Sequence, residues 1–345
     1  MAGYETESYE KPTILGIARW QIGCTNSGRM ANPLERAMRR RAPGKEINVR
    51  SRLGFIGLGY LGSRIARRLA TAGFPMVVYN RTVAKTVELA ALGAEVVDQP
   101  AKLASRVDVM LSCLFDESAV ESVYLGSGGV LSSLRPGARI IELSTISPEA
   151  SRRLHRSAER VDISVLDVAV SGSTASAEAG ALTLFGGGNR EAFDSAEPIF
   201  AAIAKQWFYM GASGSGVAMK LVVNAILGVG MQAIAEAAAL GSRLGLPREL
   251  LFDTLAKTAV VAPAHAGKLA TAKNHDYSPQ FPIRLMRKDF GLILMEAAQA
   301  GLEMPATEAA SIVNSEEAAN GREEDFSAIF RQMEQPPLTV QRTRT

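Results

Sequence analysis

The chain has 345 residues, long enough for two domains, and 47% hydrophobic with 21% charged residues is an ordinary composition for a folded globular protein. The net charge is +3, but residues 1–52 hold ten Lys/Arg and five Asp/Glu, which leaves 28 basic against 30 acidic residues in the remainder. These values exclude a wholly disordered chain and give the folded part no basic footprint for nucleic acid.

The first 51 residues lack the apolar run of a secretory signal and the acid-poor amphipathic pattern of a transit peptide. We expect residues 1–51 to form a disordered leader, or to be upstream sequence translated from too early a start, with Met38 as the alternative start. A basic arm that contacts a partner is a third interpretation.

The cysteines and histidines bear on compartment and metal binding. Cys24 and Cys113 offer no disulfide framework, so we expect a cytoplasmic protein. His155, His265 and His275 are scattered without the spacing of metal ligands, so we expect no metal site.

Short apolar runs alternate with amphipathic segments from residue 52 to about residue 212. Repeated alternation of strand and helix predicts an α/β domain of the Rossmann type, a doubly wound parallel sheet, over residues 52–212. The strands are expected at Leu53–Ile56, Met76–Tyr79, Val107–Ser112, Arg139–Leu143, Ser164–Val168 and Ala181–Phe185.

The sequence GLGYLG follows the first predicted strand and opens a predicted helix. Its glycines fit a dinucleotide-binding loop, in which the first permits a tight turn, the second lets a pyrophosphate approach the backbone, and the third allows close packing of helix and strand. The N-terminus of the helix would hold the anion. We predict that the six loop residues bind the cofactor: Gly57, Leu58, Gly59, Tyr60, Leu61 and Gly62.

The residues after the second predicted strand bear on the choice between NAD and NADP. An NAD-preferring protein usually places a carboxylate there to bond the ribose 2′-hydroxyl, whereas this chain has Asn80, Arg81 and Thr82. A guanidinium with two short polar groups suits a 2′-phosphate. We therefore predict that these three residues bind the cofactor and favour NADP(H), with NAD(H) as the alternative.

A polar turn follows the predicted strand that ends near residue 168. In this turn Ser171, Gly172 and Ser173 could present hydroxyl and backbone N–H groups to a carboxylate. A plain polar turn without a ligand is the alternative interpretation.

After about residue 212 the strand pattern stops, and residues 213–333 predict an all-helical domain. The boundary falls in the small residues of MGASGSG, and the tail 334–345, with two prolines and no periodicity, is expected to be unstructured. Helices are expected at 214–243, 247–258, 263–272, 281–300 and 305–320.

The first of these helices is apolar on almost every side, yet Lys220 and Asn224 lie one turn apart on a shared face. Gln232 and Glu236 continue the spacing of four residues but have rotated away from the face that Lys220 and Asn224 share. One interpretation is that Lys220 extends its ammonium to water along an apolar stem. A membrane span is another, which the charges and small residues argue against, so we expect no membrane association.

Four blocks of the chain resemble the β-hydroxyacid dehydrogenase family, the group of 3-hydroxyisobutyrate dehydrogenase, tartronate semialdehyde reductase and the glyoxylate/succinic semialdehyde reductases. They follow the family's order and spacing within residues 52–333. The blocks are GFIGLGYLG at 54–62, DVAVSGSTASAEAGALTLFGGG at 167–188, GSGVAMKLVVN at 214–224 and RKDFGLIL at 287–294.

The resemblance implies a 6-phosphogluconate dehydrogenase-like arrangement, with a dinucleotide-binding domain, a helical domain and an active site in the cleft between them. It implies an oxidoreductase that transfers hydride between NADP(H) and a short-chain 3-hydroxy acid, or the semialdehyde or keto acid of the glyoxylate or succinic semialdehyde type. A small-molecule substrate and a homodimer or homotetramer are the expected partners.

The resemblance also implies roles for single residues. Lys220 matches the catalytic lysine, a general acid and base whose pKa apolar surroundings would lower. Asn224 matches the asparagine that holds the substrate or orients that lysine. The other matched positions are Ser171 and Gly172 in the substrate-carboxylate loop, Thr145 by the nicotinamide, and Lys288 near the cofactor or substrate.

The chain departs from the family's usual pattern at several positions. Ala169 replaces a proline, Leu61 replaces a methionine in the glycine loop, and Phe290 replaces the leucine of the K-D-L motif. Ser173 replaces a glycine and could add a contact to the substrate. Together with the residues at 80–82, it favours a resemblance to the NADPH-dependent semialdehyde and glyoxylate reductases.

Two alternatives belong to other classes. An imine reductase shares the glycine loop, but Lys220 and the VSGS sequence argue against it. A non-catalytic dinucleotide-binding scaffold would be marked by loss of the lysine, which this chain retains.

Overall fold

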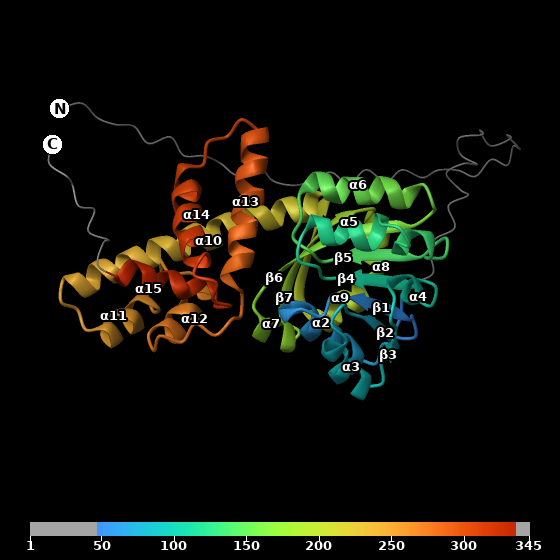
Figure 1. Ribbon diagram of the computed structural model, residues 1–345, viewed down its shortest axis with the longest axis horizontal. Coiled ribbons are helices and arrows are strands. Elements are labelled where there is room, and N and C mark those ends of the chain that lie inside the picture. The colour runs from blue at the N-terminus through green and yellow to red at the C-terminus, as the bar shows by residue number, and fades with distance from the viewer. Residues whose placement is uncertain (1–46, 336–345) are drawn as a thin grey trace, which may run out of the picture. The chain divides into compact units, whose positions relative to one another are not determined.

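The computed structural model of the protein describes residues 47–335 (Figure 1). Most of the leader predicted for residues 1–51, the alternative start at Met38 and most of the predicted tail lie outside the described residues.

The described residues begin with an eight-stranded sheet in the order β3-β2-β1-β4-β5-β6-β7-β8. Neighbouring strands are parallel except β6 and β7, which are antiparallel. The first strand is central, with Leu53 opposite both Met76 and Val109, so the order reverses there as in a doubly wound sheet. The strands are β1 (Leu53–Ile56), β2 (Met76–Tyr79), β3 (Glu95–Val96), β4 (Val109–Ser112), β5 (Arg139–Glu142), β6 (Ser164–Ser171), β7 (Leu182–Gly188) and β8 (Ala204–Gly211).

The six predicted strands are all present, with ends shifted by up to three residues. Two strands were not predicted, and both lie at the edges of the sheet. β3 has only two residues. In β8 two consecutive exposed residues are followed by an alternation of partly buried and exposed residues. An edge strand buries too little apolar surface to produce the continuous apolar run that marked the central strands.

Helices cover both faces of the sheet and bury two separate apolar layers. One layer includes Ile65 of α2 and Phe200 of α9, and the other includes Val120 of α5 and Leu154 of α6. The helices of this part are α2 (Tyr60–Thr71), α3 (Val87–Ala91), α4 (Pro100–Ala104), α5 (Glu117–Leu125), α6 (Pro148–Glu159), α7 (Thr174–Glu178), α8 (Arg190–Ser195) and α9 (Glu197–Ile203), with the 3₁₀ turns η1 (Val83–Thr86) and η2 (Val130–Ser132).

From residue 215 the described chain is helical, and all five predicted helices are present. A short 3₁₀ turn and helix near residue 330 were not predicted, because they are too brief to show a helical period. Phe326 and Phe330 are buried in the core of this part with Phe252 and Phe290. The elements are α10 (Ser215–Arg243), α11 (Arg248–Leu255), α12 (Pro263–Ala272), α13 (Ile283–Gln299), α14 (Pro305–Ala318), η3 (Phe326–Ala328) and α15 (Ile329–Glu334).

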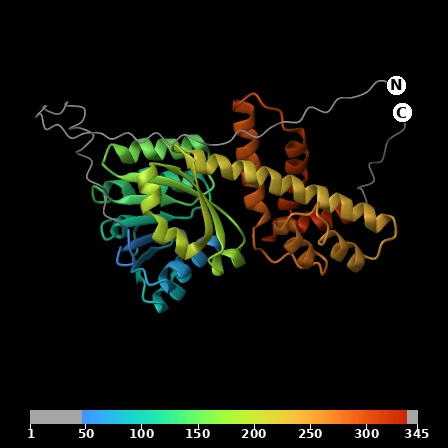
Figure 2. The same cartoon turned by 180° about the vertical axis from the view of Figure 1, so that it is seen from behind.

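The long helix α10 connects the sheet to the other helices (Figure 2). By length and composition it could cross a membrane. In the fold it packs against β6 and β7 and against α11, α12, α13, α14 and α15, which are the contacts of a core helix. The close approach to the sheet requires glycine at Gly216, where a Cβ would lie 2.4 Å from the carbonyl oxygens of Asp167 and Phe185.

Candidate active site

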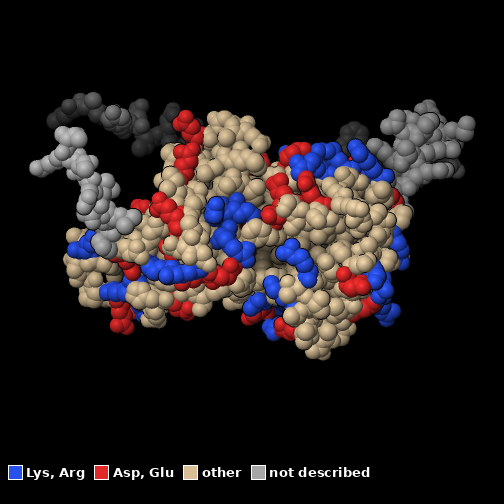
Figure 3. Space-filling model, viewed as in Figure 1, with Lys and Arg blue, Asp and Glu red and all other residues tan. Residues whose placement is uncertain are grey.

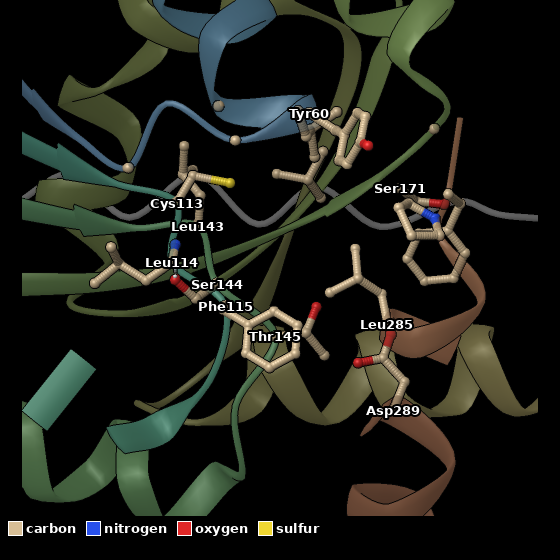
Figure 4. Close-up of a pocket in the computed structure, with 18 of the residues that line it drawn as sticks. Tyr60, Cys113, Leu114, Phe115, Leu143, Ser144, Thr145, Ser171, Leu285 and Asp289 are labelled. Carbon is tan, nitrogen blue, oxygen red and sulfur yellow. Dashed lines mark hydrogen bonds between the residues drawn. The ribbon is translucent and has the colours of Figure 1, made fainter. Parts of the chain in front are cut away.

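A cleft of about 1610 Å³ runs along the carboxyl ends of the central strands and is lined on its other side by α10, α12 and α13. This edge is where ligands bind in open α/β sheets. Figure 4 shows Cys113 and Ser144, from the ends of β4 and β5, on one side of the view, and Ser171 at the end of β6 on the other side, above Leu285 and Asp289 of α13.

The glycine loop lies between β1 and α2 at the edge of the cleft. Gly57 has φ +95°, a conformation that favours glycine, and a Cβ on Gly62 would lie 2.0 Å from the carbonyl oxygen of Gly57. A Cβ on Gly59 would have no atom within 4 Å, so the backbone there is open on the cleft side. Leu58 differs from the other loop residues, because its side chain is buried in the core.

The side chain of Asn80 connects the glycine loop to the turn after β2. Its Oδ1 accepts a hydrogen bond from the Leu58 N–H at 2.9 Å, and its Nδ2 donates to the Thr82 carbonyl at 2.9 Å. The amide therefore shapes both loops, and Arg81 and Thr82 stand exposed on the cleft wall. Lys85, one turn further, also lines the cleft and was not predicted.

The turn after β6 places Ser171, Gly172 and Ser173 on the cleft wall. Gly172 has φ +141°, and a Cβ there would lie 2.8 Å from the Leu182 side chain, so the tight turn depends on glycine. The Ser173 hydroxyl caps α7 by accepting a hydrogen bond from the Ser176 N–H at 3.2 Å. That bond occupies part of the hydrogen-bonding capacity of the Ser173 hydroxyl, which was expected to add a contact to the substrate. The Ser171 hydroxyl, in contrast, makes no hydrogen bond within residues 47–335.

Lys220 lies in the second turn of α10, and only 8% of the residue is exposed. It lines the cleft, and its burial argues against the interpretation in which its ammonium reaches open water along the helix. Desolvation lowers the pKa of Lys220 to about 8, the nearby charge of Asp289 raises it, and Lys288 lowers it further. A lysine with this pKa can both donate and accept a proton near neutral pH.

Asn224 is fully buried and does not line the cleft. Its Nδ2 donates to Oδ2 of Asp289 at 2.6 Å, while its Oδ1 has no partner in the described structure. Lys288 donates to the Thr145 carbonyl at 2.5 Å and lies 2.8 Å from Oδ1 of Asp289. Asp289, which was not predicted, thus joins the residues of α10 and α13 to the strand end that carries Thr145.

A second unpredicted carboxylate anchors the start of α10. Asp167 of β6 is fully buried, and its oxygens accept hydrogen bonds from the N–H groups of Gly214 at 2.8 Å and Val217 at 3.1 Å. Burial raises the pKa of this carboxyl, and the backbone N–H of Gly214 and the nearby His155 lower it. The helix that carries Lys220 is therefore fixed to the sheet at its N-terminus.

The ends of β4 and β5 also carry residues that were not predicted. Cys113 lines the cleft, but desolvation and then the charge of Glu142 raise the pKa of its thiol to about 12, so it forms an uncharged part of the wall. The Ser144 hydroxyl accepts a hydrogen bond from the Leu114 N–H at 2.7 Å, which joins the two strand ends. The rule that ligands bind at the carboxyl ends of parallel strands could have identified these positions from the predicted strands.

The cleft is strongly basic, in contrast with the nearly neutral chain. Lys and Arg lie on both sides of the hollow near the centre of Figure 3. Seven Lys/Arg side chains line the cleft against two carboxylates, Asp116 and Asp289. All predicted site residues except Leu58 and Asn224 line it. A cleft of this charge suits an anionic dinucleotide together with an acidic substrate. The seven cationic residues are Arg81, Lys85, Lys205, Lys220, Lys268, Arg284 and Lys288.

Two family models match the chain, one on each side of residue 212. The model described as the NAD binding domain of 6-phosphogluconate dehydrogenase matches residues 52–211. The model described as NAD-binding of NADP-dependent 3-hydroxyisobutyrate dehydrogenase matches residues 214–333.

Similar proteins extend the comparison over most of the chain. The chain is 33% identical to glyoxylate/succinic semialdehyde reductase 1 of Arabidopsis thaliana, over 81% of this chain and 96% of that protein. It is 32% identical to 2-(hydroxymethyl)glutarate dehydrogenase of Eubacterium barkeri, over 82% and 95% of the two chains. Among solved structures, 3-hydroxyisobutyrate dehydrogenase of Mycobacterium tuberculosis with L-serine matches with a TM-score of 0.75 and 29% identity, over 83% of this chain and 100% of that one.

Proposed function

The chain belongs to the β-hydroxyacid dehydrogenase family and is therefore an NAD(P)-dependent oxidoreductase acting on hydroxy acids, and within that activity we propose that it transfers hydride between NADP(H) and a short-chain substrate. The proposed substrates are a short-chain 3-hydroxy acid, or a semialdehyde or keto acid of the glyoxylate or succinic semialdehyde type. The names of the relatives support this class of substrate.

The observation that carries the proposal is the buried Lys220 in the wall of the cleft. Reduction of a carbonyl places negative charge on its oxygen, and the Lys220 ammonium is the group of α10 that can donate a proton to it. In the oxidation of a hydroxy acid, neutral Lys220 takes the hydroxyl proton. A pKa of about 8 leaves both forms populated near neutral pH.

The backbone of the glycine loop supports the proposed dinucleotide site. The open space over Gly59 lets a pyrophosphate approach the backbone at the start of α2, where unpaired N–H groups favour an anion. The nicotinamide, when bound, supplies or accepts the hydride. Thr145 and Ser144 would lie along the cleft wall between this loop and Lys220.

The turn after β2 supports the preference for NADP(H). Arg81 and Lys85 line this end of the cleft, and neither side chain has a hydrogen bond or ion pair within residues 47–335. Two unpaired cations and the Thr82 hydroxyl suit the 2′-phosphate that distinguishes NADP from NAD.

The turn after β6 and α10 would hold the substrate. Ser171 and Gly172 present a hydroxyl and backbone to the substrate carboxylate, and Lys220 lines the same cleft. The unpartnered Oδ1 of Asn224, one turn from Lys220, can accept a hydrogen bond from the lysine ammonium and so orient it. The exposed apolar side chains of Val222 and Leu240 on α10, which lie outside the cleft, support assembly into a homodimer or homotetramer.

The proposal is tested by following the absorbance of NADPH and NADH with glyoxylate, succinic semialdehyde and tartronate semialdehyde. We expect turnover with NADPH, and a fall of about tenfold in kcat/KM for NADPH in Arg81→Ala, with a much smaller change for NADH. Arg160→Ala, an exposed arginine outside the cleft, is the matched control. A wild type that turns over none of these acids would refute the proposed substrate class, and equal use of NADH would refute the cofactor preference.

A further inference from the structure

The cationic side chains of the cleft exceed the number that the proposed reaction uses. Lys268, Arg284 and Lys288 are paired with Asp325, Glu323 and Asp289, respectively. Arg81 and Lys85 lie where the 2′-phosphate would bind, and Lys220 is the proton donor. Lys205 is the remaining cationic residue of the cleft, and its side chain has no hydrogen bond or ion pair with any described residue.

Lys205 lies at an irregularity in the edge strand β8. Leu182 of β7 pairs with Ala204, but the next residue, Thr183, pairs with Gln206, so Lys205 is an extra residue in β8. Such a bulge interrupts the ladder and redirects the side chain that it carries, and bulges are common beside active sites. Here the residue lines the cleft.

The cleft wall is continuous from the substrate turn to this lysine. Ser171 of β6 pairs with Thr183 of β7, and Thr183 pairs with Gln206 of β8, so Lys205 lies two strands from Ser171. Two strand spacings correspond to roughly 10 Å. Ser176, Ala181 and Thr183 line the cleft between them, and none of these side chains carries a charge.

We propose that Lys205 binds the distal carboxylate of a substrate that carries two carboxylates, one held by the turn at Ser171–Ser173 and the other by this lysine. The proposal rests on the proposed function, because the first carboxylate is the one that the turn binds in the reaction. A short acid with one carboxylate ends before it reaches Lys205, whereas a five-carbon diacid extends along the uncharged wall towards it. An ammonium on a flexible stem is suited to a carboxylate whose position varies with chain length.

The test compares three hydroxy acids that share the reacting group. These are 3-hydroxy-2-methylpropanoate, 2-(hydroxymethyl)pentanoate, and 2-(hydroxymethyl)pentanedioate, which differs from the second only in its distal carboxylate. We expect kcat/KM of the wild type to be about tenfold higher for the diacid than for the pentanoate, because a hydrogen bond to a charged group has about this effect. In Lys205→Gln this ratio should fall to near one, and Lys205→Arg should retain most of it.

Lys257→Gln, an exposed lysine outside the cleft, is the control and should leave the ratio unchanged. A wild type that oxidises the monoacids but shows no preference for the diacid would overturn the role of Lys205 and leave the proposed function standing. A wild type that oxidises none of the three would count against the proposed function itself. A rise in KM for NADP in Lys205→Gln, with the diacid ratio intact, would assign the lysine to the cofactor and overturn the proposal.

Discussion

The two walls of the cleft are built in different ways. The sheet wall presents backbone and small side chains: the glycine loop, the turn at Gly172 and the hydroxyls of Ser144 and Ser171. The helical wall presents buried and partly buried charges on α10 and α13, with Lys220, Lys288 and Asp289 within one network. The glycines of the first wall should be sensitive to added atoms, and the charge network of the second to changes of charge.

The difference also separates stability from activity. A Cβ added at Gly62 on the sheet wall collides with the Gly57 carbonyl oxygen, so it affects the folded state before any ligand binds. A buried ammonium on the helical wall lowers stability, because burial disfavours its charged form, yet the proposed reaction requires it.

The largest effect on activity is expected on the helical wall, from Lys220→Met. Loss of the proton donor should lower kcat/KM by about 10³-fold. Because the pKa of Lys220 is lowered from 10.5 to about 8, the protonated side chain costs the folded state of the order of 3 kcal/mol at neutral pH. Urea unfolding should therefore show that the inactive variant is the more stable protein.

The gain in stability of Lys220→Met over wild type should depend on pH in a defined direction. The pKa of Lys220 is lower in the folded state than in the unfolded state. The destabilisation of the wild type by its buried ammonium is therefore complete below about pH 8 and disappears as the pH rises towards 10.5. The stabilities of wild type and variant should converge over that interval. Full activity in Lys220→Met, or a loss of stability at neutral pH, would contradict the account of the helical wall.

The sheet wall is tested by a matched pair of glycine substitutions in one loop. In Gly62→Ala the new Cβ would lie 2.0 Å from the Gly57 carbonyl oxygen, so we expect the cofactor-free protein to lose about 2 kcal/mol or more. In Gly59→Ala the Cβ meets no atom within 4 Å, so its Tm without cofactor should match wild type. Its Kd for NADP(H) should nevertheless rise about tenfold or more, because the methyl group occupies the approach of the pyrophosphate.

Thermal unfolding and dinucleotide titration of both variants give the two results separately. Equal destabilisation by the two substitutions would show that the loop tolerates no side chain anywhere, and would remove the argument for a ligand over Gly59.

The smallest effect is expected on the pH profile, where Asp289 and Lys288 act on Lys220 through charge. For reduction, kcat should be constant below about pH 8 and fall tenfold per pH unit above it, because the protonated lysine is the donor. For oxidation, kcat should rise with pH up to about pH 8, because neutral lysine is the acceptor. Asp289→Asn should move the break to lower pH, because the Asp289 charge raises the pKa of Lys220, and Lys288→Met should move it to higher pH. Initial rates over a range of pH check both, and a break that moves in neither variant would refute the electrostatic coupling.

The central strands and the glycine loop could be predicted because their signals are local. A strand buried on both faces appears in the sequence as an apolar run. The positive φ of Gly57 is a local backbone conformation that favours glycine. The edge strand β8 was missed because half of its residues face solvent. Lys85 and Lys205 were missed because an exposed lysine in the sequence looks the same whether or not it lines a cleft.

The sequence by itself determined the family, the alternation of strand and helix, the glycine loop and the candidate lysine, because each is a pattern within a short stretch of chain or a set of such patterns in order. Only the tertiary structure decided which way Lys220 faces, that Asn224 bonds Asp289, and that Asp167 anchors α10. These contacts join residues between 47 and 65 positions apart. A pKa depends on burial and on neighbouring charges, and both are set by packing of distant segments rather than by local sequence.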